Sequence, residues 1–430
     1  MELINNLPVL GNLLFISNGC GGGHIQTVNS LEEQVRNDRS DLISKTIEVY
    51  KNSFGSYIGD KVIKTWSRQQ KEGDVAALNN YLNYHWVERY VLSIITFVGF
   101  VVALLKNDID VVVNVQPFAL GALLSAIHVV NFIRRFFCCN KREPIKVLMV
   151  LTELPNAETK NFFPSIKNLR PSDQKLFTLY TTNPLLEPNQ TEEEFWKTHC
   201  GLSMENICYD QLPVRQAFFK QKNQLPPNSL SVKVDSEKNQ ELTIECCKDP
   251  TVIKTEESLT FNLTNNDRLL SIHLGGQACI PAATEYLLTR IKNQTPPLLE
   301  GKEYIFILCG ENNGDDSLFS KITKIVKENE IPDWVHIVPL THQTDEEIAP
   351  ILARSDAAII KSGGLTSMEV FTVPPKKIFI HSMCGKEISD QEEMIIHGMP
   401  VWEGGNARYL IAKQQASVVT SETIGENIYE

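Results

Sequence analysis

The residues best suited to chemistry lie in Gly-rich loops that follow short apolar runs. In FISNGCGGGHIQTV (15–28), Gly21, Gly22 and Gly23 precede His24. Glycines let the backbone turn sharply and expose N–H groups at a helix start, where a phosphate or another anion binds well. His24 could act there as a base on a sugar hydroxyl, or it could merely cap the helix. The loop matches neither the dinucleotide fingerprint nor the P-loop.

The C-terminal half repeats this strand-to-Gly pattern three times. The turns are LGGQ with Gly275, Gly276 and Gln277, ILCG with Gly310, and KSGGLTSMEV with Gly363, Gly364, Leu365, Thr366 and Glu369. One such turn is a weak signal, because α/β proteins contain many. Three at the carboxyl ends of parallel strands would face one crevice, where open α/β sheets bind ligands.

Glu369 has two interpretations on this evidence, and they are equally supported. Thr366-x-x-Glu369 matches a capping box, in which both side chains satisfy free N–H groups of the helix. The carboxylate could instead accept hydrogen bonds from both hydroxyls of a ribose.

The elements that must position these loops alternate between short apolar runs and longer helical patterns. The predicted strands are Leu13–Ile16, Val111–Val115, Val147–Leu151, Leu269–Leu274, Tyr304–Cys309, His336–Val338, Ala357–Ile360 and Lys377–Ile380. Several are apolar throughout, as parallel strands covered on both faces should be. The sequence therefore predicts an α/β protein built from doubly wound βαβ units.

The alternation stops at about 216–266, where the chain is polar and Pro-rich. Two alternating segments, LSVKV and ELTIE, suggest a hairpin-like insertion in an interdomain linker. We therefore expect an N-terminal domain at 1–215 and a C-terminal domain at 267–430.

Composition narrows the classes of partner. The net charge of −11 argues against nucleic acid, which needs a concentrated basic face. The ten cysteines form no C-x-x-C and no Cys/His spacing typical of zinc. Asp108-Ile-Asp110 precedes its strand and Asp315-Asp316 lies in a polar loop, so we expect no metal. The N-terminus lacks the basic region of a signal peptide, which favours a cytoplasmic location.

Two segments of the N-terminal half raise the question of a membrane. Val91–Leu105 is the most apolar run of the chain, but its fifteen residues are short for a span, and it predicts a buried core helix. NFIRRFFCCNKR (131–142) combines Arg134, Arg135, Phe136 and Phe137 with two cysteines. It is either a solvated helix end or a peripheral membrane-surface patch in which a cysteine could carry an acyl group.

Several segments together resemble one family. They are NGCGGGHIQTV, VVVNVQPFALGALLSAI (111–127), KVLMVLTELP (146–155), DQLPVRQAF (210–218), LGGQ, IIKSGGLTSMEV and VWEGGNARYLIAKQQASVV (401–419). Their order resembles the glycosyltransferase B fold, in the branch of lipid II N-acetylglucosaminyltransferase and the diacylglycerol glycosyltransferases. Glu153 and Gln211 depart from that branch, which usually has Asp and Gly there.

The resemblance implies two Rossmann-like domains facing a central cleft, and a role for each motif. Glu369 would bind the ribose, which makes that interpretation the favoured one, while Gly363 to Thr366 wrap the nucleotide. Glu403 and Asn406 would hold donor-sugar hydroxyls, and Arg215 the diphosphate. The backbone around Val338 and Leu340 would bind the base, and His24 or Glu153 would be the catalytic base.

The reaction implied is inverting, metal-independent transfer of a sugar from a UDP-sugar to a hydroxyl of a lipid or protein acceptor, with no cofactor. Gly-loop amides, helix N-termini and an Arg would stabilise the leaving diphosphate. A sugar-nucleotide epimerase and a non-catalytic nucleotide-sugar binder remain alternatives.

Overall fold

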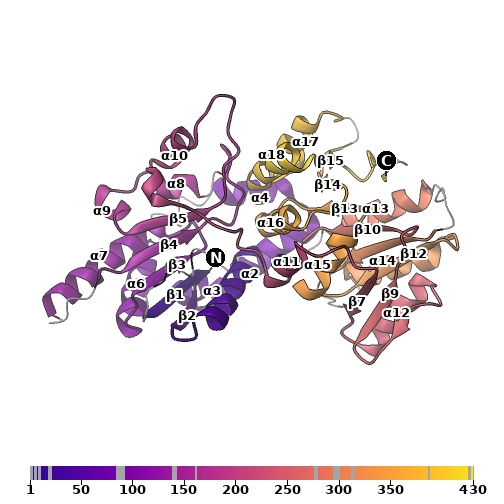
Figure 1. Cartoon of the computed structure of the whole chain (residues 1–430), viewed down its shortest axis with the longest axis horizontal. Helices are drawn as coiled ribbons and strands as arrows, with labels where there is room; N and C mark the ends of the chain where they lie inside the picture. Colours follow the sequence, from indigo (N-terminus) through magenta and orange to yellow (C-terminus); the bar gives the residue numbers. More distant parts are fainter. Residues whose placement is uncertain are drawn as a thin grey trace. The chain divides into compact units, whose positions relative to one another are not determined.

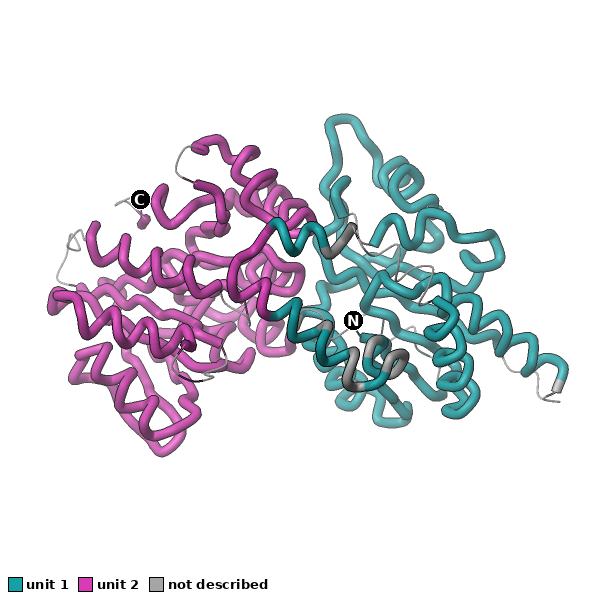
Figure 2. The backbone as a smooth tube through the Cα atoms, turned by 180° about the vertical axis from the view of Figure 1, so that it is seen from behind, with its two compact units in different colours: residues 1–67, 76–214 teal, residues 68–75, 215–430 magenta. Residues whose placement is uncertain are grey.

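The computed structural model describes residues 3, 7, 11–17, 22–83, 93–137, 143–159, 162–275, 279–293, 301–310, 314, 316–385, 388–424 and 428–429. The chain divides into two compact units (Figure 2). Unit 1 contains residues 1–67 and 76–214, and unit 2 contains residues 68–75 and 215–430. Each unit is an α/β structure with its own parallel sheet (Figure 1).

Unit 1 holds a sheet of order β2-β1-β3-β4-β5-β6, counted over its described residues. Its strands are β1 (Asn12–Ser17), β2 (Ile43–Glu48), β3 (Val111–Asn114), β4 (Lys146–Val150), β5 (Phe177–Thr181) and β6 (Ile207–Tyr209). Its helices are α2 (Gly22–Asp38), α3 (Val49–Glu72, whose end lies in unit 2), α4 (Val75–Asn83), α6 (Ser93–Lys106), α7 (Leu120–Phe137), α8 (Phe163–Ile166), α9 (Pro171–Gln174) and α10 (Glu192–Cys200), with a 3₁₀ turn at Met204–Asn206.

Both faces of this sheet are covered, because alternate residues of each strand enter different apolar cores. Leu14 and Ile16 of β1 pack with Phe100 of α6 on one face. Leu13 and Phe15 pack with residues of α2 on the other face. The strand order reverses between β1 and β3, which is where an open sheet of this type forms its crevice.

Unit 2 holds a parallel sheet of order β12-β11-β10-β13-β14-β15 within the described chain. Its strands are β10 (Arg268–His273), β11 (Glu303–Leu308), β12 (Val335–Leu340), β13 (Ala357–Ile360), β14 (Ile378–His381) and β15 (Ser417–Val419). The helices that follow them are α13 (Ile280–Lys292), α14 (Leu318–Glu328), α15 (Asp345–Arg354), α16 (Gly364–Thr372), α17 (Gln391–Gly398) and α18 (Val401–Gln414). Its order reverses between β10 and β13.

The segment 216–266 is not a linker with a hairpin but an ordered part of unit 2. It forms α11 (Gln216–Gln221), β7 (Ser229–Lys233), α12 (Glu237–Cys247), β8 (Ile253–Lys254) and β9 (Ser258–Asn262). LSVKV lies in strand β7 as expected, but ELTIE lies in α12, because the Ser236 hydroxyl accepts from Asn239 N–H and caps a helix there. Strand β7 pairs with β9 instead, and its apolar face joins the core beneath β10 to β12.

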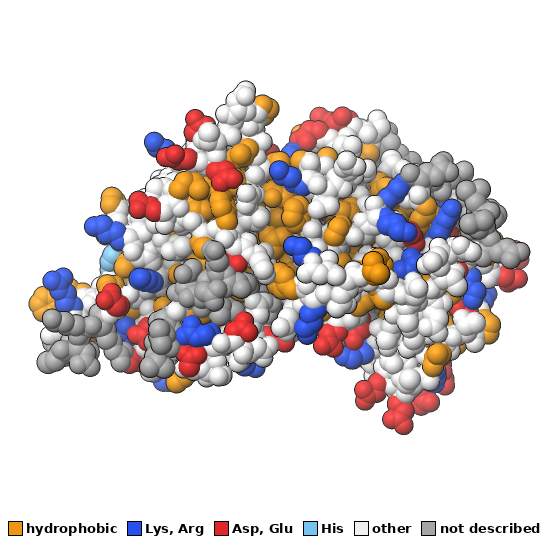
Figure 3. Space-filling view, in the orientation of Figure 1, with side chains coloured by type: hydrophobic (Ala, Val, Ile, Leu, Met, Phe, Trp, Pro, Cys, Tyr) orange, Lys and Arg blue, Asp and Glu red, His pale blue; other side chains and the backbone are white. Residues whose placement is uncertain are grey.

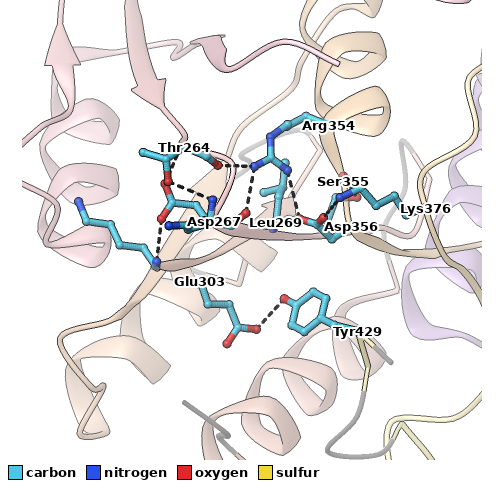
Figure 4. A network of polar contacts seen from close by, with 12 residues as sticks. Thr264, Asp267, Leu269, Glu303, Arg354, Ser355, Asp356, Lys376 and Tyr429 are labelled. Atoms are coloured by element: carbon cyan, nitrogen blue, oxygen red, sulfur yellow. Dashed lines mark hydrogen bonds and ion pairs between the residues drawn. The ribbon is translucent and has the colours of Figure 1, made fainter. Parts of the chain in front are cut away.

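The amino-terminal edge of the unit 2 sheet carries a buried polar network (Figure 4). Arg354 donates to the carbonyls of Thr264 and Asp267, both at 2.9 Å, and to Asp356 at 3.1 Å. Asp356 also accepts from the backbone of Leu269 at 2.8 Å. These bonds tie the residues that begin β10 and β13 to the end of α15.

Glu303, the first residue of β11, belongs to the same edge. It accepts two hydrogen bonds of 2.8 Å from Arg290, which is the bidentate geometry of a strong Arg–carboxylate pair. The Tyr429 hydroxyl donates to it as well, at 2.8 Å.

The α/β class and the two doubly wound sheets are confirmed, and so is each of the eight predicted strands. The sequence missed β2, β5, β6, β8, β9 and β15. Helix α6 corrects the expectation of a buried core helix, because only one of its faces is buried. Among the described residues, no helix combines the length and the apolar character that crossing a membrane requires.

Candidate functional site

The carboxyl-terminal edge of the unit 2 sheet gathers most of the predicted donor-binding residues. β10 and β13 are neighbours, with His273 opposite Ile360, so the loops after them start side by side. Gly275 has φ of +85°, and a Cβ placed there or on Gly363 would meet no atom within 4 Å. The space over both glycines is therefore open. Helix α16 begins at Gly364, so the free N–H groups of its first turn lie at this edge.

Arg215 and Glu369 form a buried ion pair at this edge. Arg215 Nε donates to Oε1 of Glu369 at 2.6 Å, and Arg215 Nη2 donates to Oε2 at 3.0 Å. The Glu369 side chain is 1 % exposed and that of Arg215 is 13 % exposed. Burial raises the pKa of Glu369, and the positive charge of Arg215 opposes that rise.

This pairing excludes the capping-box interpretation of Glu369. Helix α16 begins one residue after Gly363, which is its N-cap and caps with no side chain. Thr366 is then the third helical residue, and the Glu369 carboxylate binds Arg215 rather than a backbone N–H group. Leu365 and Thr366 lie in the first turn of α16.

A second ion pair lies at the same edge, directly after β13. Lys361 follows β13 directly, and its Nζ lies 3.1 Å from a carboxylate oxygen of Glu403 on α18. Burial raises the pKa of Glu403, and the positive charge of Lys361 only partly opposes that rise. Asn406, one turn further along α18, donates to the carbonyl of Ser362 at 2.9 Å. Sequence reasoning missed Lys361, although it is the only charged residue between the strand and the Gly pair.

Three buried polar atoms at this edge have no hydrogen-bond partner among the described residues. They are Nδ1 of His273, Oγ1 of Thr341 and Oγ of Ser367. Buried polar groups are nearly always paired, so such atoms need an explanation, and a bound ligand is one. In the sequence only their places mark them: His273 ends β10, Thr341 follows β12 and Ser367 lies in the first turn of α16.

The other described residues predicted for the donor site lie in the loop after β11 or on β12. Gly310 follows β11 with φ of +69°, a conformation that favours glycine. Val338 and Leu340 are buried in β12, and the Leu340 carbonyl already accepts from Cys309 N–H at 2.8 Å. Gly276 and Gln277 lie outside the described residues.

In unit 1 the structure places His24 at the reversal point of the sheet. His24 lies in the first turn of α2, and its Nδ1 is 2.8 Å from the carbonyl of Val115, just after β3. A carbonyl can only accept, so Nδ1 carries the hydrogen and Nε2 holds the lone pair of the neutral ring. Burial lowers the pKa of His24 to about 4, and the bond to Val115 opposes that shift. The imidazole is therefore neutral at pH 7, and it bonds to the neighbouring loop rather than capping its own helix.

Glu153, the other candidate base, lies in the loop after β4. Its neighbour Thr152 has its hydroxyl 3.3 Å from His24 Nδ1. The structure thus brings His24 and the 152–153 loop together. Gly22 and Gly23 open helix α2, and Gly21 lies outside the described residues.

The arrangement is suited to an anionic ligand with hydroxyl groups. Unit 2 presents two partly buried cations, two buried carboxylates and two open Gly loops at one sheet edge. Within the described chain, no cluster of three or more His, Cys, Asp or Glu side chains has a geometry that could hold a metal ion.

No protein-family model and no curated protein matches the chain. Solved structures that align with it include MurG of Acinetobacter baumannii, at 10 % identity over 97 % of this chain and 88 % of that one, with a TM-score of 0.47. The spinosyn rhamnosyltransferase SpnG in complex with thymidine diphosphate aligns at 9 % identity over 95 % and 86 %, with a TM-score of 0.43. A UDP-N-acetylglucosamine 2-epimerase described as putative, from Listeria monocytogenes, aligns at 10 % identity over 97 % and 91 %, with a TM-score of 0.41.

Proposed function

We propose that this chain is a glycosyltransferase of the B fold, which moves a sugar from a UDP-sugar to a hydroxyl of an acceptor with inversion and without a metal. The observation that carries the proposal is the carboxyl edge of the unit 2 sheet. Two buried ion pairs and two open Gly loops meet there, at the reversal point where sheets of this order bind nucleotides.

In this proposal the diphosphate lies against the N–H groups of Gly363, Gly364, Leu365 and Thr366. The N-terminus of α16 favours its negative charge. Glu369 binds the ribose hydroxyls while it stays paired with Arg215, because a carboxylate has about four acceptor sites and Arg215 uses two. Arg215 then neutralises the charge that grows on the leaving group.

Glu403 and Asn406 have different roles in the donor site. Glu403 is held by Lys361 and has acceptor capacity left for sugar hydroxyls. Asn406 donates to the Gly loop through its amide nitrogen, so it also fixes the position of that loop.

Unit 1 supplies the base. With Nδ1 donating to Val115, His24 presents the lone pair of Nε2 to an acceptor hydroxyl. Glu153 is the second candidate. Attack on the anomeric carbon from the face opposite the leaving diphosphate inverts its configuration.

Release of UDP from a panel of UDP-sugars tests the proposal, since many transferases slowly pass the sugar to water. The wild-type chain should release UDP, and Glu369→Ala should abolish the release. Glu328→Ala, which removes an exposed carboxylate of the same unit, should leave the rate unchanged. Tight UDP binding without turnover would favour the non-catalytic binder, and interconversion of two UDP-sugars without UDP release would favour the epimerase.

Arg215 provides a more specific test of the leaving-group role. Arg215→Gln should lower kcat more than it weakens donor binding, because the charge it stabilises develops in the transition state. Equal losses in both quantities would contradict that role.

The acceptor is proposed to be a lipid, or a protein, presented at a membrane surface that this cytoplasmic chain contacts peripherally. Helix α6 exposes Ile94, Val98 and Val102, which recur every four residues on one face. The adjacent α7 exposes Phe132 and Phe136. Such an apolar surface on two packed helices is typical of an interaction site.

The basic residues of α7 divide into two kinds. Arg134 is buried and donates to Asp108 at 3.1 Å, so it does not serve a membrane patch. Arg135 is exposed, as is Lys106 at the end of α6. Elsewhere, the face drawn in Figure 3 mixes acidic and basic side chains. Cys138, Cys139, Lys141 and Arg142 lie outside the described residues.

Flotation of the full chain with vesicles tests this surface. The wild type should float with vesicles that contain anionic lipid. The double variant Val98→Glu/Val102→Glu should remain in the bottom fraction of the gradient. Leu225→Glu is the control, since Leu225 is 90 % exposed but lies in unit 2. A wild-type chain that ignores anionic vesicles would remove the membrane part of the proposal.

A further inference from the structure

We propose that His273 is a nucleotide-binding residue of unit 2 whose imidazole donates a hydrogen bond to a phosphate oxygen of the bound nucleoside diphosphate. The inference rests on the nucleotide-sugar function proposed above. It adds a residue to that site which none of the sequence motifs included.

His273 occupies a position at the centre of the candidate site. It is the last residue of β10 and lies opposite Ile360 of β13, across the reversal point of the sheet. Lys361 N–H donates to its carbonyl at 3.2 Å, so its backbone joins the two Gly loops. Gly275, with the open space above it, follows two residues later.

The side chain of His273 lies on the sheet face that is covered by α15. Alternation along β10 places it on the same side as Leu269, which packs with Ile351 of α15. Arg215 is close enough for its charge to act on the imidazole. His273 thus lies between the Gly275 loop, where a diphosphate would approach the backbone, and the Arg215–Glu369 pair that would bind the ribose.

The imidazole has an unused hydrogen-bonding atom. His273 is 6 % exposed, and its Nδ1 has no partner among the described residues. Burial lowers its pKa to about 4, with Arg215 adding to the effect, so the ring is neutral. A neutral imidazole has one N–H group to donate, and an anionic phosphate oxygen is a strong acceptor for it.

A second histidine of the same sheet provides a matched control. His336 is also buried, and its Nε2 likewise has no partner within the described chain, while its Nδ1 bonds to the Cys247 carbonyl at 2.7 Å. It is the second residue of β12 and therefore lies near the opposite, amino-terminal edge. The two residues share burial and an unpaired nitrogen and differ in which end of the strands they occupy.

The experiment measures UDP affinity of the full chain by calorimetry for the wild type, His273→Leu, His273→Gln and His336→Leu. His273→Leu should weaken UDP binding about tenfold or more, because it removes a hydrogen bond to a charged group. His273→Gln keeps an N–H donor and should lose less, and His336→Leu should bind as the wild type does. Equal affinity of the wild type and His273→Leu would overturn the proposal.

An imidazole ¹⁵N spectrum of the wild type gives a reading that does not depend on a variant folding. Addition of UDP should shift the His273 nitrogens and leave those of His336 in place. Unshifted His273 signals at saturating UDP would count against the contact. A wild-type chain that binds no UDP in either measurement would instead remove the nucleotide-sugar function itself, so the two failures are distinguishable.

Discussion

The two edges of the unit 2 sheet use the same kinds of charged residue in different ways. At the amino edge, Arg354 donates to two carbonyls and to Asp356, and Glu303 accepts from both Arg290 and Tyr429. At the carboxyl edge, each of Glu369 and Glu403 is paired with a single cation of the described chain, and burial raises the pKa of both.

The difference indicates which edge stabilises the fold and which is kept for a ligand. Fully paired charges at the amino edge hold the strand starts together. At the carboxyl edge, buried carboxylates with remaining acceptor sites lie near three polar atoms without a partner among the described residues, on His273, Thr341 and Ser367, whereas the amino edge has Nε2 of His336. A folded protein retains such costs at sites of function, where a ligand completes the hydrogen bonds.

Removing Arg354 should give the largest loss of stability. Arg354→Met leaves the carbonyls of Thr264 and Asp267 without this donor and Asp356 without its buried cation, so the free energy of unfolding should fall by about 3–5 kcal/mol. Urea denaturation measures this loss. UDP affinity of the folded protein should stay unchanged.

Lys376→Met is the matched control for that variant. Lys376 also binds Asp356, at 2.5 Å, but its side chain is 71 % exposed. Its loss should cost less than about 1 kcal/mol, as is usual for exposed pairs. Equal losses in the two variants would show that burial at the amino edge is not what matters.

Glycines at the two edges should separate stability from binding. A Cβ on Gly301, near the start of β11, would lie 2.1 Å from the carbonyl oxygen of Asn266, so Gly301→Ala should cost about 1–3 kcal/mol of stability. A Cβ on Gly363 would meet nothing within 4 Å, and Gly363→Ala should cost less than about 1 kcal/mol, the price of Ala at an N-cap.

The same two variants should rank in the opposite order for UDP. The methyl group of Gly363→Ala occupies the space where the diphosphate approaches the backbone, so affinity should fall about tenfold. Calorimetry and urea denaturation of both proteins test the pair. If Gly363→Ala binds UDP normally, the open space at the carboxyl edge is not the phosphate site.

The central strands were predictable from the sequence, and the outer ones were not. β3 and β13 are buried on both faces and read as unbroken apolar runs. β2, at an edge of its sheet, has the half-polar sequence ISKTIE and is mostly exposed, so no apolar run marks it. ELTIE alternates like a strand, but it is helical, because Ser236 caps a helix there and β7 pairs with β9 instead.

The site was predictable where glycine and charge coincide in one short segment. The segment KSGGLTSMEV indicates Gly363 and Glu369 as candidate site residues. The pairing of Glu369 with Arg215 joins residues 154 positions apart, so no local sequence pattern predicts it. His273 belongs to a mostly apolar strand, which by its sequence is typical of the protein core. Its significance depends on which edge of the sheet it reaches and on what surrounds its ring.

The smallest predicted effect concerns the sign of the pH dependence at the two edges. Burial raises the pKa of Glu403 above its ordinary value of 4.5, so its proton is bound more tightly in the folded protein. Relative to Glu403→Gln, the wild type should therefore lose stability as the pH rises from 4.5 through the folded pKa.

Asp249, at the amino edge, should show the opposite slope. Burial alone would raise its pKa, but hydrogen bonds from Tyr304, from Thr251 and from Lys302 outweigh it and hold the pKa below the ordinary value of 3.8. Relative to Asp249→Asn, the wild type should lose stability as the pH falls below 3.8. Each slope is limited to about 1.4 kcal/mol per pH unit, because one proton is involved. Urea denaturation of the three proteins at a series of pH values measures both, and slopes of the same sign would contradict the division between a stabilising edge and a binding edge.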